Sequence, residues 1–138
     1  MRPVTEIIVH CSATEAGKDF RADDIRRWHV KGNGWKDIGY HFVIDIDGTI
    51  EVGRPMAQKG AHTANHNEKT VGICYVGGLK YGKPADTRTE AQKRSLRSLI
   101  QVMKSCFPDI AKVSGHRDYA NKACPCFDAH AEYDILVR

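Results

Sequence analysis

Short apolar runs along the chain predict the strands of a sheet. Residues 6–11 (EIIVHC) and 71–76 (VGICYV) are rich in β-branched and other apolar side chains, and both runs are too short for typical helices. Residues 40–46 and 49–52 flank Asp47-Gly48, which is typical of a tight hairpin because glycine tolerates the positive φ that such a turn needs. The sheet is therefore expected to contain at least one antiparallel pair of strands.

Two other segments carry apolar residues at helical spacing. The segment 22–31 places Ile25, Trp28 and His29 on one face and is followed by a glycine-containing turn. The segment 89–107 carries a longer apolar stripe, and Thr89 with Gln92 resembles a capping box. A short strand near 112–114 and a helical C-terminal segment complete the pattern. Together these elements predict a single α/β domain over residues 1–138, with a central mixed sheet flanked by helices on its faces.

Composition narrows the class of protein. A chain of 138 residues with 41% hydrophobic and 28% charged residues is typical of one globular domain, which excludes a disordered or fibrous protein. No apolar run approaches the roughly 18 residues of a membrane span, and the first residues show no signal-peptide core, so we expect synthesis in the cytoplasm. The net charge of +4 fits an anionic partner, but the basic residues are scattered, so nucleic-acid binding is not expected.

Five cysteines and seven histidines make a metal site worth testing, because an odd cysteine count argues against a full disulfide framework. His10 lies at the end of the first predicted strand, His116 follows the last, and Cys124 lies in the loop beyond. Two imidazoles and one thiolate suit Zn²⁺ and leave a fourth position for water. Spacing alone leaves alternatives open, since strand-end histidines are more often structural. A blue-copper site would use the same residues plus an axial ligand such as Met56 or Met103.

Six ordered motifs add a specific resemblance to these residue-level arguments. The chain contains HCSAT at residue 10, GYHF at 39, GAH at 60, NHN at 65, VGIC at 71 and KACP at 122. In this order they resemble the zinc-dependent N-acetylmuramoyl-L-alanine amidases, the family shared by bacteriophage amidase lysozymes and peptidoglycan recognition proteins. The phage lysozyme branch is the most similar. The resemblance extends from Glu6 to Asp128 and implies the α/β fold of that family.

Carried over position by position, the resemblance implies that His10, His116 and Cys124 bind zinc and that Tyr40 and Lys122 are catalytic. Tyr40 is expected in the strand beside His10, where its phenol could hydrogen-bond the attacking water. The Lys122 ammonium could stabilise the oxyanion that develops during attack on the amide carbonyl.

The resemblance also implies residues that contact the substrate. His62 and Asn67 lie in a polar loop and match positions that line the substrate groove of the family. Trp35 is interpreted either as a platform for a sugar or as a cap on the core. His41 follows Tyr40 on a predicted strand, so we expect it to face the opposite way and to pack against a helix.

The implied reaction is hydrolysis of the amide between N-acetylmuramic acid and the first stem-peptide residue, L-alanine. Peptidoglycan or muropeptides would be the partner of a monomeric, endolysin-like enzyme that acts on the cell wall, and nothing in the sequence tests a host-protein partner. The alternative is a non-catalytic peptidoglycan-binding module, which in this family is marked by loss of the ligand cysteine. Cys124 is present together with Tyr40 and Lys122, which favours catalysis.

Cys126 departs from the family pattern, in which a small or hydroxyl residue is usual at this position. The sequence Cys124-Pro125-Cys126 brings two thiols together, which could compete for zinc or form a strained disulfide on oxidation. We therefore expect an oxidation-sensitive enzyme. Three further cysteines are interpreted as small buried hydrophobic residues: Cys11, Cys74 and Cys106.

Overall fold

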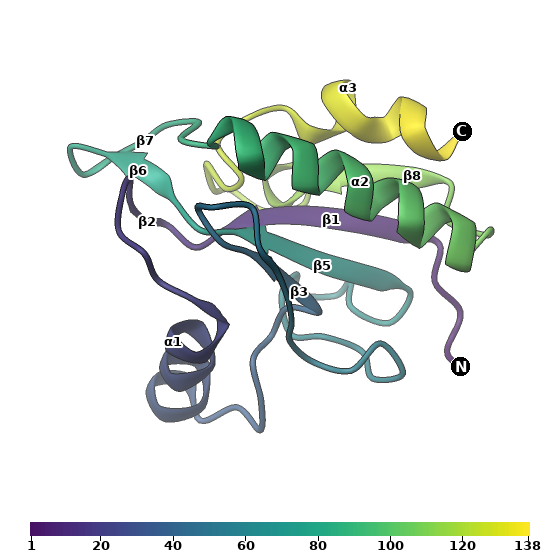
Figure 1. The fold of residues 1–138 in the computed structure, drawn as a ribbon. Helices are drawn as coiled ribbons and strands as arrows, with labels where there is room; N and C mark the ends of the chain where they lie inside the picture. Colours follow the sequence, from purple (N-terminus) through teal and green to yellow (C-terminus); the bar gives the residue numbers. More distant parts are fainter.

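The computed structural model describes all of residues 1–138, and its centre is a five-stranded mixed sheet (Figure 1). The strands lie in the order β4-β3-β5-β1-β8, and only β4 is antiparallel to its neighbour. Their bounds are β1 Glu6–Cys11, β3 Phe42–Ile44, β4 Ile50–Val52, β5 Thr70–Tyr75 and β8 Lys112–Gly115. The predicted mixed sheet and its hairpin are confirmed, although β3 and β4 are shorter than the sequence pattern indicated.

The register of the parallel strands brings their carboxyl ends to one edge. His10 of β1 pairs with Cys74 of β5, and Val9 pairs with Gly115, the last residue of β8. The residue after β8 is His116, which begins a short 3-10 helix at 116–118. Parallel pairing of β1 with β8 therefore places His10 and His116 side by side at the open edge of the sheet.

The long helix α2, Glu90–Cys106, begins with the predicted capping box. The amide of Gln92 donates to Oγ1 of Thr89 at 3.1 Å, and the amide of Thr89 donates to Oε1 of Gln92 at 3.0 Å. The side-chain amide of Gln92 also donates to the carbonyl oxygens of Ile44 and Val76 at 3.2 and 2.9 Å. The residue that caps the helix thus also fixes the helix to the sheet.

Alternation along β1 divides its side chains between two layers. Ile7, Val9 and Cys11 belong to the main core, which includes the buried stripe of α2. That face is covered by α2, by α3 (Ala129–Tyr133) and by the 3-10 helix Asp134–Val137 that follows it (Figure 1). His10 points to the opposite face, which keeps a polar side chain out of the main core.

The opposite face is covered in part by the first helix. Residues Ala22–Arg27 form α1, and Trp28–Gly32 continue it as a π-helix, so the predicted helix is confirmed but its second half is wider than an α-helix. Ala22 and Ile25 pack there in a second, smaller core with Val43 of β3. Figure 1 shows α1 on the side of the sheet away from α2.

Three short strands form a second sheet that the sequence pattern missed. They are β2 Thr14–Glu15, β6 Gly78–Lys80 and β7 Lys83–Pro84, in the order β2-β6-β7. Strands of two or three residues carry too little periodicity to be recognised. The prediction that Cys106 is buried is wrong: it lies exposed in the last turn of α2, while the next residue, Phe107, packs against the core. None of the helices combines the length and apolar character needed to cross a membrane.

Candidate metal centre

Three of the predicted residues meet at the carboxyl edge of the sheet. The donor atoms of His10, His116 and Cys124 all lie within 4.8 Å of one another, and the rings of His10 and His116 are 4.6 Å apart between centroids. Nδ1 of His10 lies 3.9 Å from Sγ of Cys124. Tetrahedral zinc holds nitrogen and sulfur donors roughly 3.3–3.8 Å apart. A small closing movement of these side chains would therefore fit one ion.

The environment keeps the imidazoles of this group neutral. Burial lowers the pKa of His10 well below its ordinary value, and the neighbouring rings of His62 and His116 lower it further. Burial also lowers the pKa of His116, and the Lys122 ammonium adds to that effect. A neutral imidazole has the free lone pair that a metal requires. The two histidines are thus in the protonation state of metal ligands at neutral pH.

Backbone contacts place the sulfur of Cys124 against β1. The amide of Cys11 donates a hydrogen bond to Sγ of Cys124 at 3.2 Å. A Cβ added at Gly115 would lie 2.8 Å from Cδ of Pro125, so only glycine lets the loop that carries Cys124 approach the end of β8 this closely. The sequence motifs predicted His10, His116 and Cys124 as ligands, but nothing in them indicated this contact.

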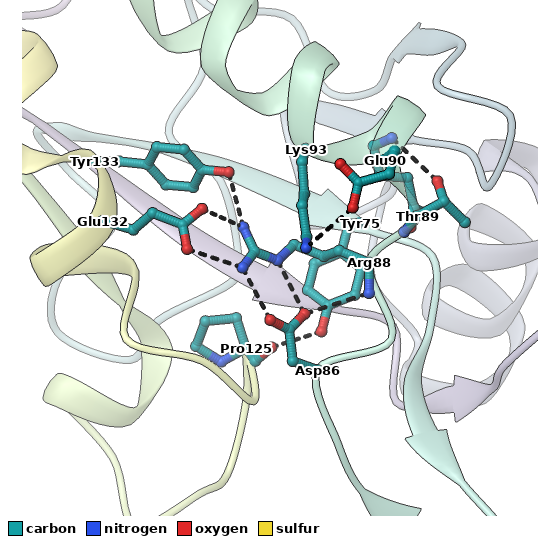
Figure 2. A network of polar contacts seen from close by, with 10 residues as sticks. Tyr75, Asp86, Arg88, Thr89, Glu90, Lys93, Pro125, Glu132 and Tyr133 are labelled. Atoms are coloured by element: carbon teal, nitrogen blue, oxygen red, sulfur yellow. Dashed lines mark hydrogen bonds and ion pairs between the residues drawn. The ribbon is translucent and has the colours of Figure 1, made fainter.

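The buried side chain of Arg88 contacts the segment that follows Cys124, and Figure 2 shows its polar partners. The guanidinium of Arg88 forms ion pairs with Asp86 at 2.9 Å and Glu132 at 2.7 Å, and its side chain is only 2% exposed. It also lies over the ring of Phe127, 3.4 Å from the centroid. Nearby, the hydroxyl of Tyr75 donates to the carbonyl oxygen of Pro125 at 2.7 Å. These contacts fix both ends of the segment 125–127, next to Cys124.

Tyr40 lies beside the group formed by His10, His116 and Cys124, although it is not in the strand that the sequence predicted. It precedes β3 by two residues, and β5 separates β3 from β1. The Tyr40 ring is nevertheless 5.0 Å from the ring of His10 between centroids. Burial raises the pKa of the Tyr40 phenol well above its ordinary value, and the nearby thiols raise it further. The phenol is therefore a neutral hydrogen-bonding group at this edge.

A surface hollow of about 380 Å³ opens next to the group. It brings together five residues that the sequence singled out, along with Tyr119: Trp35, His62, Asn67, His116 and Lys122. Trp35 is 37% exposed, so part of its ring is accessible from this hollow. The roles of these side chains stay predictions, but their common position is what a substrate site beside the ligands requires.

Two of the residues expected to bind substrate have contacts within the protein. The His62 ring is buried, 8% exposed, and its Nδ1 lies 2.8 Å from Nε2 of His10. Oδ1 of Asn67 accepts from the amides of His62 and Thr63 at 3.1 and 3.0 Å, so this side chain also shapes the loop. Burial lowers the pKa of His62 to about 3. No sequence signal distinguished these contacts from exposure to substrate.

The expectation for His41 is only partly met. Its ring is fully buried, but its hydrogen-bond partners come from β5 and from loops rather than from a helix. Nδ1 accepts from the amide of Gly72 at 3.1 Å, and Nε2 lies 2.8 Å from the carbonyl oxygen of Gln58. Alternation holds only within a regular strand, and His41 lies just before β3.

Cys126 has a different partner from the one its spacing suggested. Its sulfur lies 3.9 Å from Sγ of Cys11 and 3.4 Å from the carbonyl oxygen of Gly78. Cys124, in contrast, contacts His10 and the backbone of Cys11. The Cys11 thiol lies near both sulfurs, and its contact with Cys124 is the main cause that raises the pKa of Cys11. Of the two sulfurs, that of Cys124 is the one that also contacts His10.

Comparisons with known proteins agree with this geometry. Residues 1–127 match the N-acetylmuramoyl-L-alanine amidase family. The endolysin of Klebsiella phage KP32 is 46% identical over 125 residues, covering 90% of this chain and 82% of the phage protein. Among solved structures, the amidase LysC from Clostridium intestinale has a TM-score of 0.77 at 28% identity, covering 90% of this chain and 77% of that one. Bumblebee PGRP-SA has a TM-score of 0.79 at 30% identity, covering 96% of this chain and 81% of the bumblebee chain.

The chain therefore belongs to the N-acetylmuramoyl-L-alanine amidase family. It is a peptidoglycan hydrolase whose activity is cleavage of the amide between N-acetylmuramic acid and L-alanine. Met103, one of the two methionines considered for a copper site, lies in the main core.

Proposed function

We propose that the enzyme is a zinc amidase whose ion is held by His10, His116 and Cys124. The observation that carries the proposal is the convergence of two neutral imidazoles and one thiol within 4.8 Å beside a solvent-open hollow. Three protein ligands are the usual number in catalytic zinc sites, which keep one position open. Zinc bound there supplies Lewis acidity, which activates water and polarises the scissile carbonyl.

Two further side chains have roles that follow from their positions. Tyr40, with its neutral phenol beside His10, is proposed to hydrogen-bond the attacking water. Lys122 lines the hollow with His116 and is proposed to stabilise the negative charge that develops on the carbonyl oxygen. The water oxygen adds to the lactyl carbonyl carbon, the C–N bond breaks, and the nitrogen of L-alanine takes up a proton. The products are a lactyl carboxylate on the glycan and a stem peptide with a free amino group.

Trp35, His62 and Asn67 line the same hollow, and we propose that the part of each side chain facing it contacts the sugar or the stem peptide. We also propose that the enzyme acts as a monomer. The phage relatives are endolysins, which supports the further proposal that this enzyme degrades the wall of a bacterial host.

Digestion of defined muropeptides, with products identified by mass spectrometry, tests the proposal. We expect release of intact stem peptides, loss of release with a zinc chelator, and recovery when zinc is restored. Zinc content gives a separate readout: wild type should hold about one ion per chain. Cys124→Ser should lose the ion, and the matched variant Cys126→Ser should keep it. Loss of zinc only in Cys126→Ser would contradict the ligand assignment.

The catalytic proposal is tested at the two assisting residues. Tyr40→Phe and Lys122→Met should each lower kcat by roughly 100-fold or more while zinc content is unchanged. Lys83→Met, in the exposed strand β7, is the matched control and should retain wild-type kcat. Wild-type rates in both Tyr40→Phe and Lys122→Met would remove these residues from the mechanism.

A further inference from the structure

The ring of His62 is placed to act on a metal ligand rather than on substrate alone. It packs flat against β5, where a Cβ added at Gly72 would lie 2.6 Å from Cγ and Cδ2 of the ring. Both ring nitrogens have partners inside the protein: Nδ1 lies 2.8 Å from Nε2 of His10, and Nε2 lies 3.3 Å from Oγ1 of Thr70. The glycine at position 72 leaves the space that this arrangement needs.

The hydrogen-bond chain through His62 has a fixed direction. It ends at the carbonyl oxygen of His66, which can only accept, and Oγ1 of Thr70 donates to it at 2.6 Å. Thr70 has therefore used its hydrogen, so its oxygen accepts from Nε2–H of His62. A neutral imidazole carries one hydrogen, which leaves Nδ1 of His62 as an acceptor. No carboxylate is among the hydrogen-bond partners of this buried ring, so nothing stabilises a second proton on it.

The last step of the chain sets the tautomer of His10. Because Nδ1 of His62 presents a lone pair at 2.8 Å, Nε2 of His10 must carry the hydrogen. Oγ1 of Thr63 lies 3.3 Å from Nε2 of His10 and 3.0 Å from Nδ1 of His62. The Thr63 hydroxyl can therefore accept from Nε2–H of His10 or donate its own hydrogen to Nδ1 of His62. Either arrangement leaves the hydrogen on Nε2. The lone pair of His10 is then on Nδ1, the atom that lies 3.9 Å from Sγ of Cys124.

We propose that His62 is a positioning residue that holds His10 as its Nε2–H tautomer and so directs the Nδ1 lone pair to the metal. The proposal rests on the proposed function, because it assigns a purpose to the tautomer only if His10 binds the ion. Partners of this kind, which hydrogen-bond the second nitrogen of a histidine ligand, typically change metal affinity by 10- to 100-fold.

Two measurements test it, and the first uses no variant and no metal. Long-range ¹H–¹⁵N correlation spectra of the metal-free wild-type protein should show His10 as the Nε2–H tautomer and His62 also protonated on Nε2. An Nδ1–H tautomer of His10 would overturn the proposal. This result stands whether or not the chain binds zinc, so it separates failure here from failure of the zinc site itself.

The second measurement is zinc affinity by competition with a chromophoric chelator. His62→Phe keeps an aromatic ring but removes the acceptor, and we expect a 10- to 100-fold weaker affinity. His62→Asn retains an acceptor oxygen near the position of Nδ1 and should restore much of the loss. His66→Ala is the matched control, because it keeps the backbone carbonyl that ends the chain, and it should bind zinc like wild type. Equal zinc affinity in wild type and a folded His62→Phe would overturn the proposal, whereas absence of zinc binding in wild type would overturn the proposed function.

Discussion

The guanidinium of Arg88 lies 3.4 Å from the centre of the Phe127 ring, three residues from Cys124. Arg88 is thereby the link between α3, the segment before α2 and the loop that carries a proposed zinc ligand (Figure 2). The position of this loop is therefore fixed by the buried Arg88 side chain as well as by the close packing of Pro125 on Gly115.

Replacing Arg88 with lysine should therefore destabilise the protein. A lysine keeps the charge but cannot make both bidentate ion pairs or stack on Phe127. We expect a loss of about 2 kcal/mol in the free energy of unfolding, measured with urea, and weaker zinc binding. Lys93→Met removes an exposed ion pair with Glu90 and is the control, expected to change stability by less than about 1 kcal/mol. Equal stability of Arg88→Lys and wild type would show that the network is dispensable.

The close approach of Gly115 and Pro125 gives a second prediction. Gly115→Ala should cost about 1–3 kcal/mol in the free energy of unfolding and weaken zinc binding, because the new methyl group forces the Cys124 loop away from β8. Gly32→Ala is the matched control: nothing lies within 4 Å of a Cβ added there. Urea unfolding and chelator competition on both variants measure the difference. If both substitutions have the same effect, the packing argument is wrong.

Oxidation should join Cys126 to Cys11 rather than to Cys124. The sulfurs of Cys11 and Cys126 are 3.9 Å apart, and Cys126 is partly exposed. With hydrogen peroxide as oxidant, two thiols and one peroxide molecule give one disulfide and two water molecules. Mass spectrometry of peptides from the oxidised protein should identify the Cys11–Cys126 link, and Cys126→Ser should abolish it. A dominant Cys124–Cys126 link would support the pairing that the sequence spacing suggested.

Asp45 gives a prediction about pH. Its Oδ2 accepts from Arg21 at 3.0 Å, but the buried Oδ1 has no hydrogen-bond partner. Burial raises the pKa of Asp45 to about 7, and the nearby Glu51 carboxylate adds to the shift. The folded protein therefore holds this proton more tightly than the unfolded chain does, so the stabilising contribution is present below about pH 4 and is lost as pH rises to about 7.

Urea unfolding of wild type and Asp45→Asn between pH 4 and 8 measures this effect. The free energy of unfolding of wild type should fall across that range relative to the variant, which cannot titrate at this position. Asp47→Asn is a control at the same turn, because hydrogen bonds from Thr49 lower the pKa of Asp47 instead. The free energy of unfolding of Asp47→Asn should still fall between pH 4 and 8, as in wild type. Parallel curves for wild type and Asp45→Asn would refute the prediction.

The sequence by itself determined the elements whose signals are local. The capping residues of α2, its apolar stripe, the Asp47-Gly48 turn and the alternation along β1 all depend on near neighbours, so each was predictable. The motifs also identified the residues that the structure gathers at the carboxyl edge of the sheet. The second sheet was missed because two- and three-residue strands exist only through their pairing.

Tertiary structure alone decided how the gathered residues contact one another. Alternation predicted that Cys11 faces away from His10, but only the approach of a loop more than a hundred residues later showed that its neighbour is Cys126. Likewise, His62 was recognised as a site residue, yet its contact with His10 depends on the space above Gly72 and on Thr70 across the loop. A hydrogen bond requires ångström-scale placement of two groups distant in sequence, which residue types and spacing do not specify.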